Sequence, residues 1–247
     1  MNTNNIQEFY QGLEIEKGSK ADSSFKQVLT QLTPVANGRL LDIGCLDGSK
    51  TVLIKDAVGC DEAYGIDFLP KSLAEAEKRG VHTTCVDLNR DLPLAFPDHH
   101  FDVIFCGEVI EHVFSPDDLM DEIARLLKPG GYAVVTTPNL ASWKNRMVLL
   151  LGWQPFYSEV STRGRYGNPL APAGLPSGHI RMFTSRALGE LAEACGLRVE
   201  SVGGLFLPVQ KGHFLISGVS NWVDTVTARR WPTLADRTML RLRKPRA

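Results

Sequence analysis

Two carboxylates and an imidazole lie close together in the segment GEVIEHV. Glu108, Glu111 and His112 occupy positions i, i+3 and i+4, so one turn of helix would project all three side chains from the same side. His179, in the segment SGHIRMFT, can add a second imidazole from across a cleft. Such mixed oxygen and imidazole ligands suit Mg²⁺ tolerably and Mn²⁺, Fe²⁺ or Zn²⁺ better. The spacing therefore predicts a divalent-metal site built from Glu108, Glu111, His112 and His179.

Two other roles are open to the same side chains. A neutral imidazole near pH 7 can serve as a metal ligand or as a general base, so His112 and His179 are also candidate proton acceptors. Glu108 is the candidate catalytic carboxylate beside them. A purely structural role for the group is the remaining alternative.

Small and acidic residues follow the apolar run in RLLDIGCLDGSK. Gly44, Cys45 and Gly48 leave room at the predicted turn, and Asp42 places a carboxylate beside it. A nucleotide-like cofactor approaches a backbone closely only where side chains are absent and amide N–H groups are available. The segment therefore predicts one wall of a cofactor pocket.

These residues need a sheet to bring them together. Asp67 and Asp87 close two further apolar runs, as Asp42 does in the first. Apolar runs that predict strands alternate with amphipathic patterns that predict helices, which indicates right-handed crossovers and a parallel sheet with its ligand site at the carboxyl ends of the strands. After the first strand, the expected strands are 62–67, 81–87, 101–106, 131–137, 197–202 and 238–244, and the expected helices include 69–79, 117–128 and 184–195.

The chain resembles the class I S-adenosylmethionine-dependent methyltransferases over roughly residues 30–245. The glycine-rich first motif of that family matches 41–48, and the segments YGID, CVDL, GEVIEHV and LLKPGGYAVVTTPN match its later motifs. Leu46 stands where many members carry glycine. The resemblance implies an α/β fold: a Rossmann-like, seven-stranded, mostly parallel sheet with an antiparallel C-terminal strand and helices on both faces.

The resemblance also implies roles for the acids. Asp67 would accept hydrogen bonds from two ribose hydroxyls, a bidentate geometry that suits a carboxylate. Asp87 would accept from the exocyclic amine of adenine while the amide of Leu88 donates to a ring nitrogen. The cofactor-binding set is completed by Phe68, by Glu108 at the amino acid part of the cofactor, and by the residues of the first motif. A Rossmann dehydrogenase would need G-x-G-x-x-G, which this motif lacks.

The histidine and glutamate set is similar to two branches of that family. It looks like the metal ligands of the small-RNA 2′-O-methyltransferases, and like the corresponding residues of the ubiquinone-pathway O-methyltransferases. In related enzymes without a metal, the first acid touches the cofactor and the histidine packs or acts as a base. The resemblance therefore implies S-adenosylmethionine as cofactor, with a divalent metal as an additional expectation.

Length and composition fit one domain over residues 1–247. We expect residues 1–38 to form a helical cover, with Phe25, Val28, Leu29 and Leu32 facing inward, and 138–181 to form an acceptor-binding insert. A net charge of −1 argues against a polyanion as an obligatory partner, and no apolar run is long enough to span a membrane. The polar N-terminus and the five cysteines without a C-x-x-C pair favour a cytoplasmic protein with reduced thiols.

The favoured function is methyl transfer from S-adenosylmethionine to a hydroxyl of a small molecule or glycan. One alternative is an RNA-terminal 2′-O-methyltransferase, although no RNA-binding module is recognisable in the sequence. A second alternative is a methyltransferase-like binding protein without turnover. An apolar stripe over 213–226 is more typical of a core helix or a homodimer face than of a substrate-binding surface.

Overall fold

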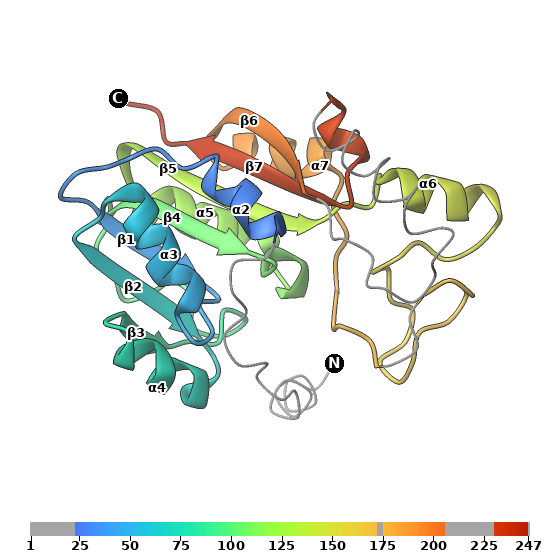
Figure 1. Cartoon of the computed structure of the whole chain (residues 1–247), viewed down its shortest axis with the longest axis horizontal. Helices are drawn as coiled ribbons and strands as arrows, with labels where there is room; N and C mark the ends of the chain where they lie inside the picture. The colour runs from blue at the N-terminus through green and yellow to red at the C-terminus, as the bar shows by residue number, and fades with distance from the viewer. Residues whose placement is uncertain (1–22, 172–174, 206–229, 247) are drawn as a thin grey trace.

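Seven strands of the described chain form one sheet in the order β3-β2-β1-β4-β5-β7-β6 (Figure 1). The computed structural model describes residues 23–171, 175–205 and 230–246; the expected lead-in over 1–22 and the stripe over 213–226 lie outside these ranges. β7 runs antiparallel to both of its neighbours, and the other strand pairs are parallel. The predicted fold class is therefore confirmed. The strands are β1 Arg39–Ile43, β2 Glu62–Asp67, β3 His82–Cys85, β4 Phe101–Gly107, β5 Leu127–Pro138, β6 Arg198–Leu205 and β7 Arg237–Arg243.

The strand order places β1 and β4 side by side at the centre of the sheet. From β1 the chain winds outward through β2 to β3, and then returns to the other side of β1 to form β4. In open α/β sheets the ligand crevice lies outside the carboxyl ends of the strands where the winding reverses. Gly44, Asp67 and Glu108 directly follow or close β1, β2 and β4, so the topology brings the predicted functional residues to one edge.

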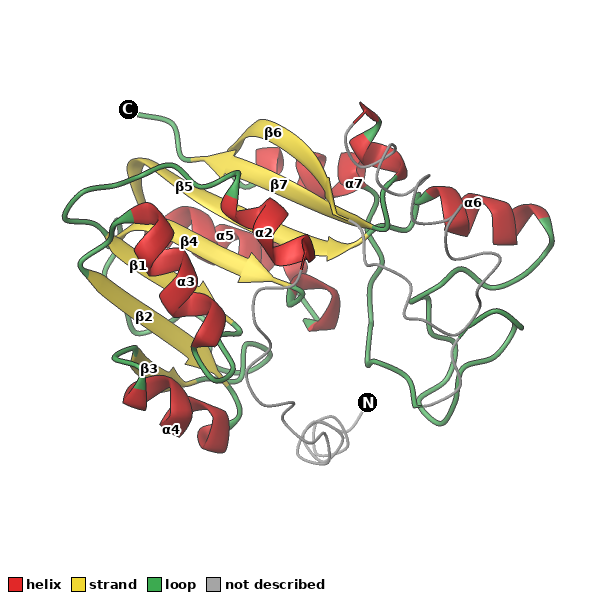
Figure 2. Ribbon diagram, viewed as in Figure 1, coloured by secondary structure: helices red, strands yellow, loops and turns green. Residues whose placement is uncertain are grey.

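Helices cover both faces of the sheet (Figure 2). α2 and α3 lie on one face and α5 and α7 on the other, while α4 packs beside β2 and β3. Because side chains alternate along a strand, Leu40 packs with α2 and α3 while Leu41 packs with α5 and α7. The helices are α2 Ser23–Leu29, α3 Ser49–Val58, α4 Pro70–Lys78, α5 Pro116–Leu126, α6 Trp143–Leu150 and α7 Ser185–Ala194, with 3₁₀ turns η1 Ile110–His112 and η2 Pro232–Leu234.

The inward face expected for the N-terminal helix is confirmed. Phe25 and Val28 are buried on the sheet, and Leu29 and Leu32 pack partly buried beside them. Among the described residues, no helix is both long and apolar enough to cross a bilayer.

Several element boundaries differ from the sequence prediction, those of α5, β5 and β3 for identifiable reasons. The strand expected to begin at 131 begins at Leu127, because Leu127 already pairs with Phe101 before a register shift. The preceding helix consequently ends at Leu126, two residues early. The strand expected over 81–87 forms a ladder only over His82–Cys85 at the sheet edge.

The insert expected over 138–181 leaves the sheet after β5. A parallel bridge between Asn139 and Phe183 closes its base. Within it, α6 is followed by a long irregular segment that extends to one side of the sheet (Figure 2). The insert thus stands beside the carboxyl edge, where it can contribute residues to a site.

Candidate active site at the carboxyl edge

The turn after β1 needs glycine because another segment passes against it. Gly44 has a φ of +80° and Gly48 a φ of +72°, both in the left-handed region. A Cβ on Gly44 would lie 2.5 Å from Cγ2 of Val109, which is closer than atoms can approach. The backbone N–H groups of Gly44 and Cys45 donate to the carbonyl of Ile66, at 2.8 and 3.1 Å. The turn is therefore fixed against β2 and the start of η1.

Asp67 closes β2 and holds the neighbouring turns. Its Oδ2 accepts the N–H of Leu46 at 3.1 Å and its Oδ1 accepts the N–H of Leu69 at 3.0 Å. Burial raises the pKa of Asp67, which is 6% exposed. Since a carboxylate offers about four lone-pair sites, Asp67 keeps acceptor capacity beyond these backbone bonds. The position fits the predicted ribose contact.

Asp42 connects a strand to a helix. Its Oδ2 accepts the hydroxyl of Thr51 on α3 at 2.5 Å, and burial raises the pKa of Asp42 to about 7, an effect that the Thr51 bond partly offsets. Cys45 is buried beside it, and burial raises the pKa of its thiol. Asp42 thus ties β1 to the helix that follows the glycine turn.

Asp87 lies in the turn that follows β3. Its Oδ1 accepts the N–H of Asn89 at 3.0 Å, and its Oδ2 lies 3.5 Å from Nε of Arg90. Phe68 and Leu88, which follow the two acids, are half-buried. The cofactor-binding residues predicted at strand ends are thus all near the carboxyl edge, and their contacts to a cofactor stay a prediction.

Glu108 does not lie on one helical face with Glu111 and His112, although their i, i+3 and i+4 spacing predicts it. Its backbone is left-handed, with a φ of +58°, and the turn that follows is a 3₁₀ turn, so Glu108 does not share a helical face with Glu111. Its Oε1 accepts the hydroxyl of Thr136 at 2.9 Å, and its Oε2 lies 3.3 Å from Nε of Arg237. A non-glycine residue held in this region costs about 1–2 kcal/mol, a strain typical of functional sites.

Glu111 is a fully buried carboxylate. Its Oε2 accepts the hydroxyl of Thr137 at 2.9 Å, whereas its Oε1 is buried without a hydrogen-bond partner. Burial raises the pKa of Glu111 to about 8, and the charge of Glu108 adds to the effect. An acceptor in this position needs a proton or a cation, because an unpaired buried charge is costly.

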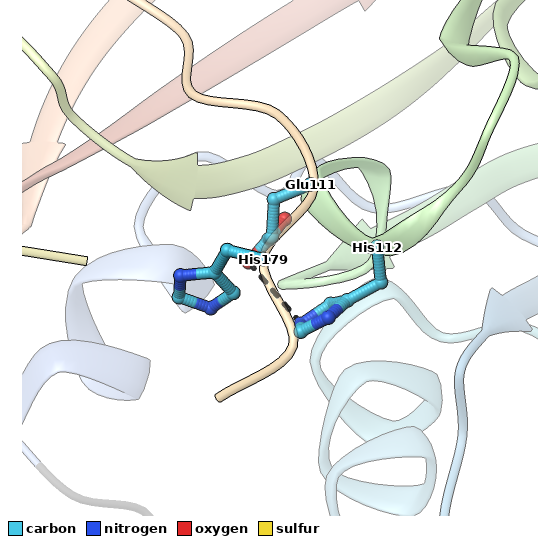
Figure 3. A group of neighbouring side chains, drawn as sticks. All are labelled: Glu111, His112 and His179. Carbon is cyan, nitrogen blue, oxygen red and sulfur yellow. Dashed lines mark ion pairs between the residues drawn. The ribbon is translucent and has the colours of Figure 1, made fainter. Parts of the chain in front are cut away.

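His112 and His179 face each other across the edge of the insert. Their ring centroids are 4.8 Å apart, and Nε2 of His112 lies 3.9 Å from Oε1 of Glu111 (Figure 3). Nδ1 of His112 bonds the carbonyl of Gly178 at 3.2 Å, and Nδ1 of His179 bonds the carbonyl of Tyr157 at 3.1 Å. A carbonyl only accepts, so each ring carries its proton on Nδ1 and its lone pair on Nε2.

Burial keeps both imidazoles neutral. It lowers the pKa of His112 to about 4, with a further contribution from His179, and it also lowers the pKa of His179. One ligand atom each from Glu111, His112 and His179 lies within 4.8 Å of the others. Of the four predicted metal ligands, the structure brings together these three, and it directs Glu108 to Thr136 and Arg237 instead.

Two residues of this region escape the sequence prediction. Arg237 begins β7 opposite Pro138 and pairs with Glu108. Glu159 accepts the backbone N–H groups of Ser177, Gly178 and His179. The available signal was that Glu159 is the sole acidic residue in the sequence from 138 to 181.

Comparison with known proteins identifies the family. The profile of the methyltransferase domain family matches residues 19–202. Ubiquinone biosynthesis O-methyltransferase of Chromobacterium violaceum is 27% identical over 233 residues, covering 82% of this chain and 90% of the relative. The protein of the same name from Coxiella burnetii is 26% identical over 196 residues, covering 78% and 76%.

Solved structures share the fold. An S-adenosylmethionine-dependent methyltransferase from Mesorhizobium loti superposes with a TM-score of 0.59 at 17% identity, covering 91% of this chain and all of that one. The cyclase SpnF superposes with a TM-score of 0.58 at 20% identity, covering 99% and 93%. At these identities the likeness shows the fold alone, whereas the family profile covers most of the chain. The chain therefore belongs to the methyltransferase domain family and is an S-adenosylmethionine-dependent methyltransferase.

Proposed function

We propose that this methyltransferase transfers the methyl group of S-adenosylmethionine to a hydroxyl oxygen of a small molecule or glycan, with a divalent cation held by Glu111, His112 and His179. The names of the relatives, ubiquinone biosynthesis O-methyltransferase, support oxygen as the acceptor atom. In the reaction an O–C bond forms as the S–C bond breaks. S-adenosylhomocysteine leaves, and the hydroxyl proton passes to a base.

The cofactor end rests on the glycine turn and the acids. The small residues over 44–48 leave room for the amino acid part, and the Asp67 carboxylate would accept from the ribose hydroxyls beside the turn amides that it already holds. Glu108 directly follows β4 at the same edge and is held by Thr136 and Arg237. Methyl transfer is an in-line displacement, so fixing the two ends on one rigid edge supplies much of the acceleration.

The single observation that carries the metal proposal is the orphaned Oε1 of Glu111, which faces the lone-pair nitrogen of His112. Metal-binding histidines usually donate their other N–H to a carbonyl or carboxylate, as His112 and His179 do here. Carboxylate oxygen with two imidazoles suits Zn²⁺, Fe²⁺ or Mn²⁺ better than Mg²⁺. When bound, such a cation would lower the pKa of the acceptor hydroxyl and orient its oxygen.

Zn²⁺ or Mn²⁺ titration into chelator-treated protein tests this proposal. Wild-type protein should bind one cation, and Glu111→Gln and His179→Ala should each weaken binding by about a hundredfold or more, as expected when one of three ligands is lost. His82→Ala, on the exposed edge strand β3, is the matched control and should bind as wild type does. Equal binding by all four proteins would exclude a metal site at this position.

Catalysis without a metal is the second candidate, and the Nδ1–H bonds of both rings support it, because they leave Nε2 as the proton-accepting nitrogen. Nε2 of His112 or His179 would then accept the hydroxyl proton. Acceptor screening with labelled S-adenosylmethionine, in chelator and with added divalent ions, separates the two mechanisms. Full turnover in chelator that is lost in His112→Gln would establish the general-base mechanism.

A further inference from the structure

The five consecutive backbone N–H groups of 177–181 all donate to one of two glutamates. Three donate to the side chain of Glu159 and two to the backbone carbonyl of Glu111. Glu159 accepts from Ser177, and its Oε2 accepts the N–H of Gly178 at 2.7 Å and that of His179 at 3.0 Å. The carbonyl of Glu111 then accepts the N–H groups of Ile180 and Arg181, at 2.8 and 3.1 Å. The chain over 177–181 is thus fixed from the insert on one side and from η1 on the other.

The three amides around Glu159 form an anion-binding concavity. Gly178 has a φ of +83°, and successive N–H groups converge where the backbone turns through a left-handed residue. The carboxylate that fills this concavity has an 8% exposed side chain, so its charge-assisted bonds are shielded from water. Arg165 lies 4.0 Å from Oε1 of Glu159 and donates to the hydroxyl of Ser177 at 2.9 Å.

This turn supports both imidazoles at once. Gly178 provides the carbonyl that holds Nδ1 of His112, and His179 is itself a member of the turn. Two residues before Glu159, Tyr157 provides the carbonyl that holds Nδ1 of His179. Segment 157–159 therefore contacts 177–179 through both a carboxylate and a carbonyl.

We propose that Glu159 is a positioning residue: by binding the amides of 177–179 it fixes the orientation and the Nδ1–H tautomer of His112 and His179. The role of the two histidines in this inference rests on the proposed function, whereas the hydrogen bonds that hold them do not depend on it. Glu159 is the sole acid in a stretch with five lysine or arginine residues, so substituting it removes the one carboxylate able to fill the concavity from within the insert.

Glu159→Gln and Asn168→Ala form a matched pair for the test. A glutamine side chain is similar in size to the original glutamate, but its amide group would present N–H donors to backbone N–H donors. Asn168 also stabilises the insert: it donates to the carbonyl of Gln154 at 2.8 Å and accepts from the N–H of Leu170 at 2.9 Å. Neither bond involves residues 177–179. The two variants separate a specific effect on the histidines from a general loosening of the insert.

The first readout is ¹⁵N NMR of the histidine rings in the full chain. Wild type should show His112 and His179 as neutral Nδ1–H tautomers at pH 7; Glu159→Gln should give mixed tautomers for both, and Asn168→Ala should resemble wild type. Glu159→Asp, which keeps the charge on a shorter side chain, should restore part of the wild-type spectrum. Unchanged ring signals in Glu159→Gln, or equal changes in Asn168→Ala, would overturn the proposal.

Binding measurements distinguish this proposal from the proposed function. Glu159→Gln should leave S-adenosylmethionine affinity within about twofold of wild type and weaken Zn²⁺ binding about tenfold, a typical loss for a residue that supports ligands. If wild type binds no Zn²⁺ but the ring tautomers still depend on Glu159, the metal proposal fails and the positioning role stands. A parallel loss of S-adenosylmethionine affinity would show unfolding of the edge and contradict the positioning role.

Discussion

Asp67 holds two turn amides, and we predict that the same two oxygens bind the ribose of the cofactor. Asp67→Asn keeps one acceptor for the turn amides but loses the charge, so S-adenosylmethionine should bind about tenfold more weakly, the scale of one charge-assisted hydrogen bond. Isothermal titration calorimetry measures the change. Asp56→Asn, exposed on α3, is the control; wild-type affinity in Asp67→Asn would remove this residue from the cofactor site.

At the residue scale the sequence identified the right chemical types but only part of their geometry. Glu111, His112 and His179 meet as their types suggested, although 66 positions separate His112 from Gly178, the residue whose carbonyl its ring bonds. Spacing alone placed Glu108 with them. Its left-handed backbone directs its side chain elsewhere, and glutamate is not among the residue types that are enriched at positive φ.

At the element scale, the tie between β1 and α3 makes stability depend on pH. Burial raises the pKa of Asp42 from 3.8 to about 7, so between these values the unfolded chain releases a proton that the folded chain keeps. The stability contributed by Asp42 is therefore complete below about pH 4, falls as the pH rises to about 7, and is constant above it. Asp42→Asn should remove this fall.

Urea unfolding of wild type and Asp42→Asn from pH 5 to pH 8, without cofactor, measures the effect. The free-energy difference between the two should grow with pH in favour of the variant, because the asparagine side chain never carries a charge. Parallel pH profiles would mean that Asp42 ionises normally in the folded protein. Asp61→Asn, exposed before β2, provides the control profile.

The turn between β1 and α3 contains a non-glycine residue, Leu46, whose strained backbone a glycine would relieve. Leu46 has a φ of +47° and is 52% exposed, so its side chain contributes little packing while its backbone is left-handed. Leu46→Gly should stabilise the protein by up to about 1 kcal/mol, because the relief of strain exceeds the added entropy of the unfolded chain. A thermal melt tests this. A lower Tm would show that the leucine side chain contributes more than its exposure suggests.

Elements were more predictable than their ends. Helix α5 was foreseen because Leu119, Ile123 and Leu126 repeat on one face, and these residues are indeed fully buried. The boundary between α5 and β5 could not be predicted, because Leu127 joins the sheet by pairing with Phe101, which lies 26 positions earlier in the sequence. Local patterns specify which segment is a helix, whereas tertiary pairing decides where it stops.

At the scale of the whole molecule, Arg241 joins parts of the chain that are distant in sequence. Its guanidinium lies 3.9 Å from the ring centre of Tyr132, donates to Oγ1 of Thr33 at 2.8 Å and to Glu200 at 2.9 Å. Arg243 and Arg241 lower the pKa of Glu200 to about 2. The segment after α2, β5, β6 and β7 thus meet at one nearly buried cation.

Arg241→Met should lower the free energy of unfolding by about 3 kcal/mol, because it leaves polar partners without their donor. Arg198→Met is the control: its side chain is 69% exposed, and it should cost less than about 1 kcal/mol. Urea denaturation gives both values. Hydrogen exchange over 25–33 should accelerate in Arg241→Met alone; equal losses in the two variants would mean that Arg241 has no special role.

The contacts that hold His112 and His179 in place also depend on tertiary structure, so the sequence does not predict them. Its position as the sole acid from 138 to 181 distinguishes Glu159, but the sequence does not indicate that its carboxylate meets amides 18 to 20 positions later. Irregular segments lack the periodicity that makes helices and strands readable. The sequence did locate the insert and its closing histidine, because composition alone marks a long irregular stretch.

The contacts between 157–159 and 177–179 limit how the insert can be exchanged between related proteins. Exchange of the insert between relatives, by evolution or by design, is safe only when its breakpoints respect the contacts of 157–159 with 177–179. If the insert binds the acceptor, as the sequence predicts, a graft confined to 160–176 would change that surface and leave the contacts between 157–159 and 177–179 intact. A graft that starts earlier would have to carry its own matching carboxylate and carbonyl, so the transferable unit is the whole stretch from Tyr157 to His179.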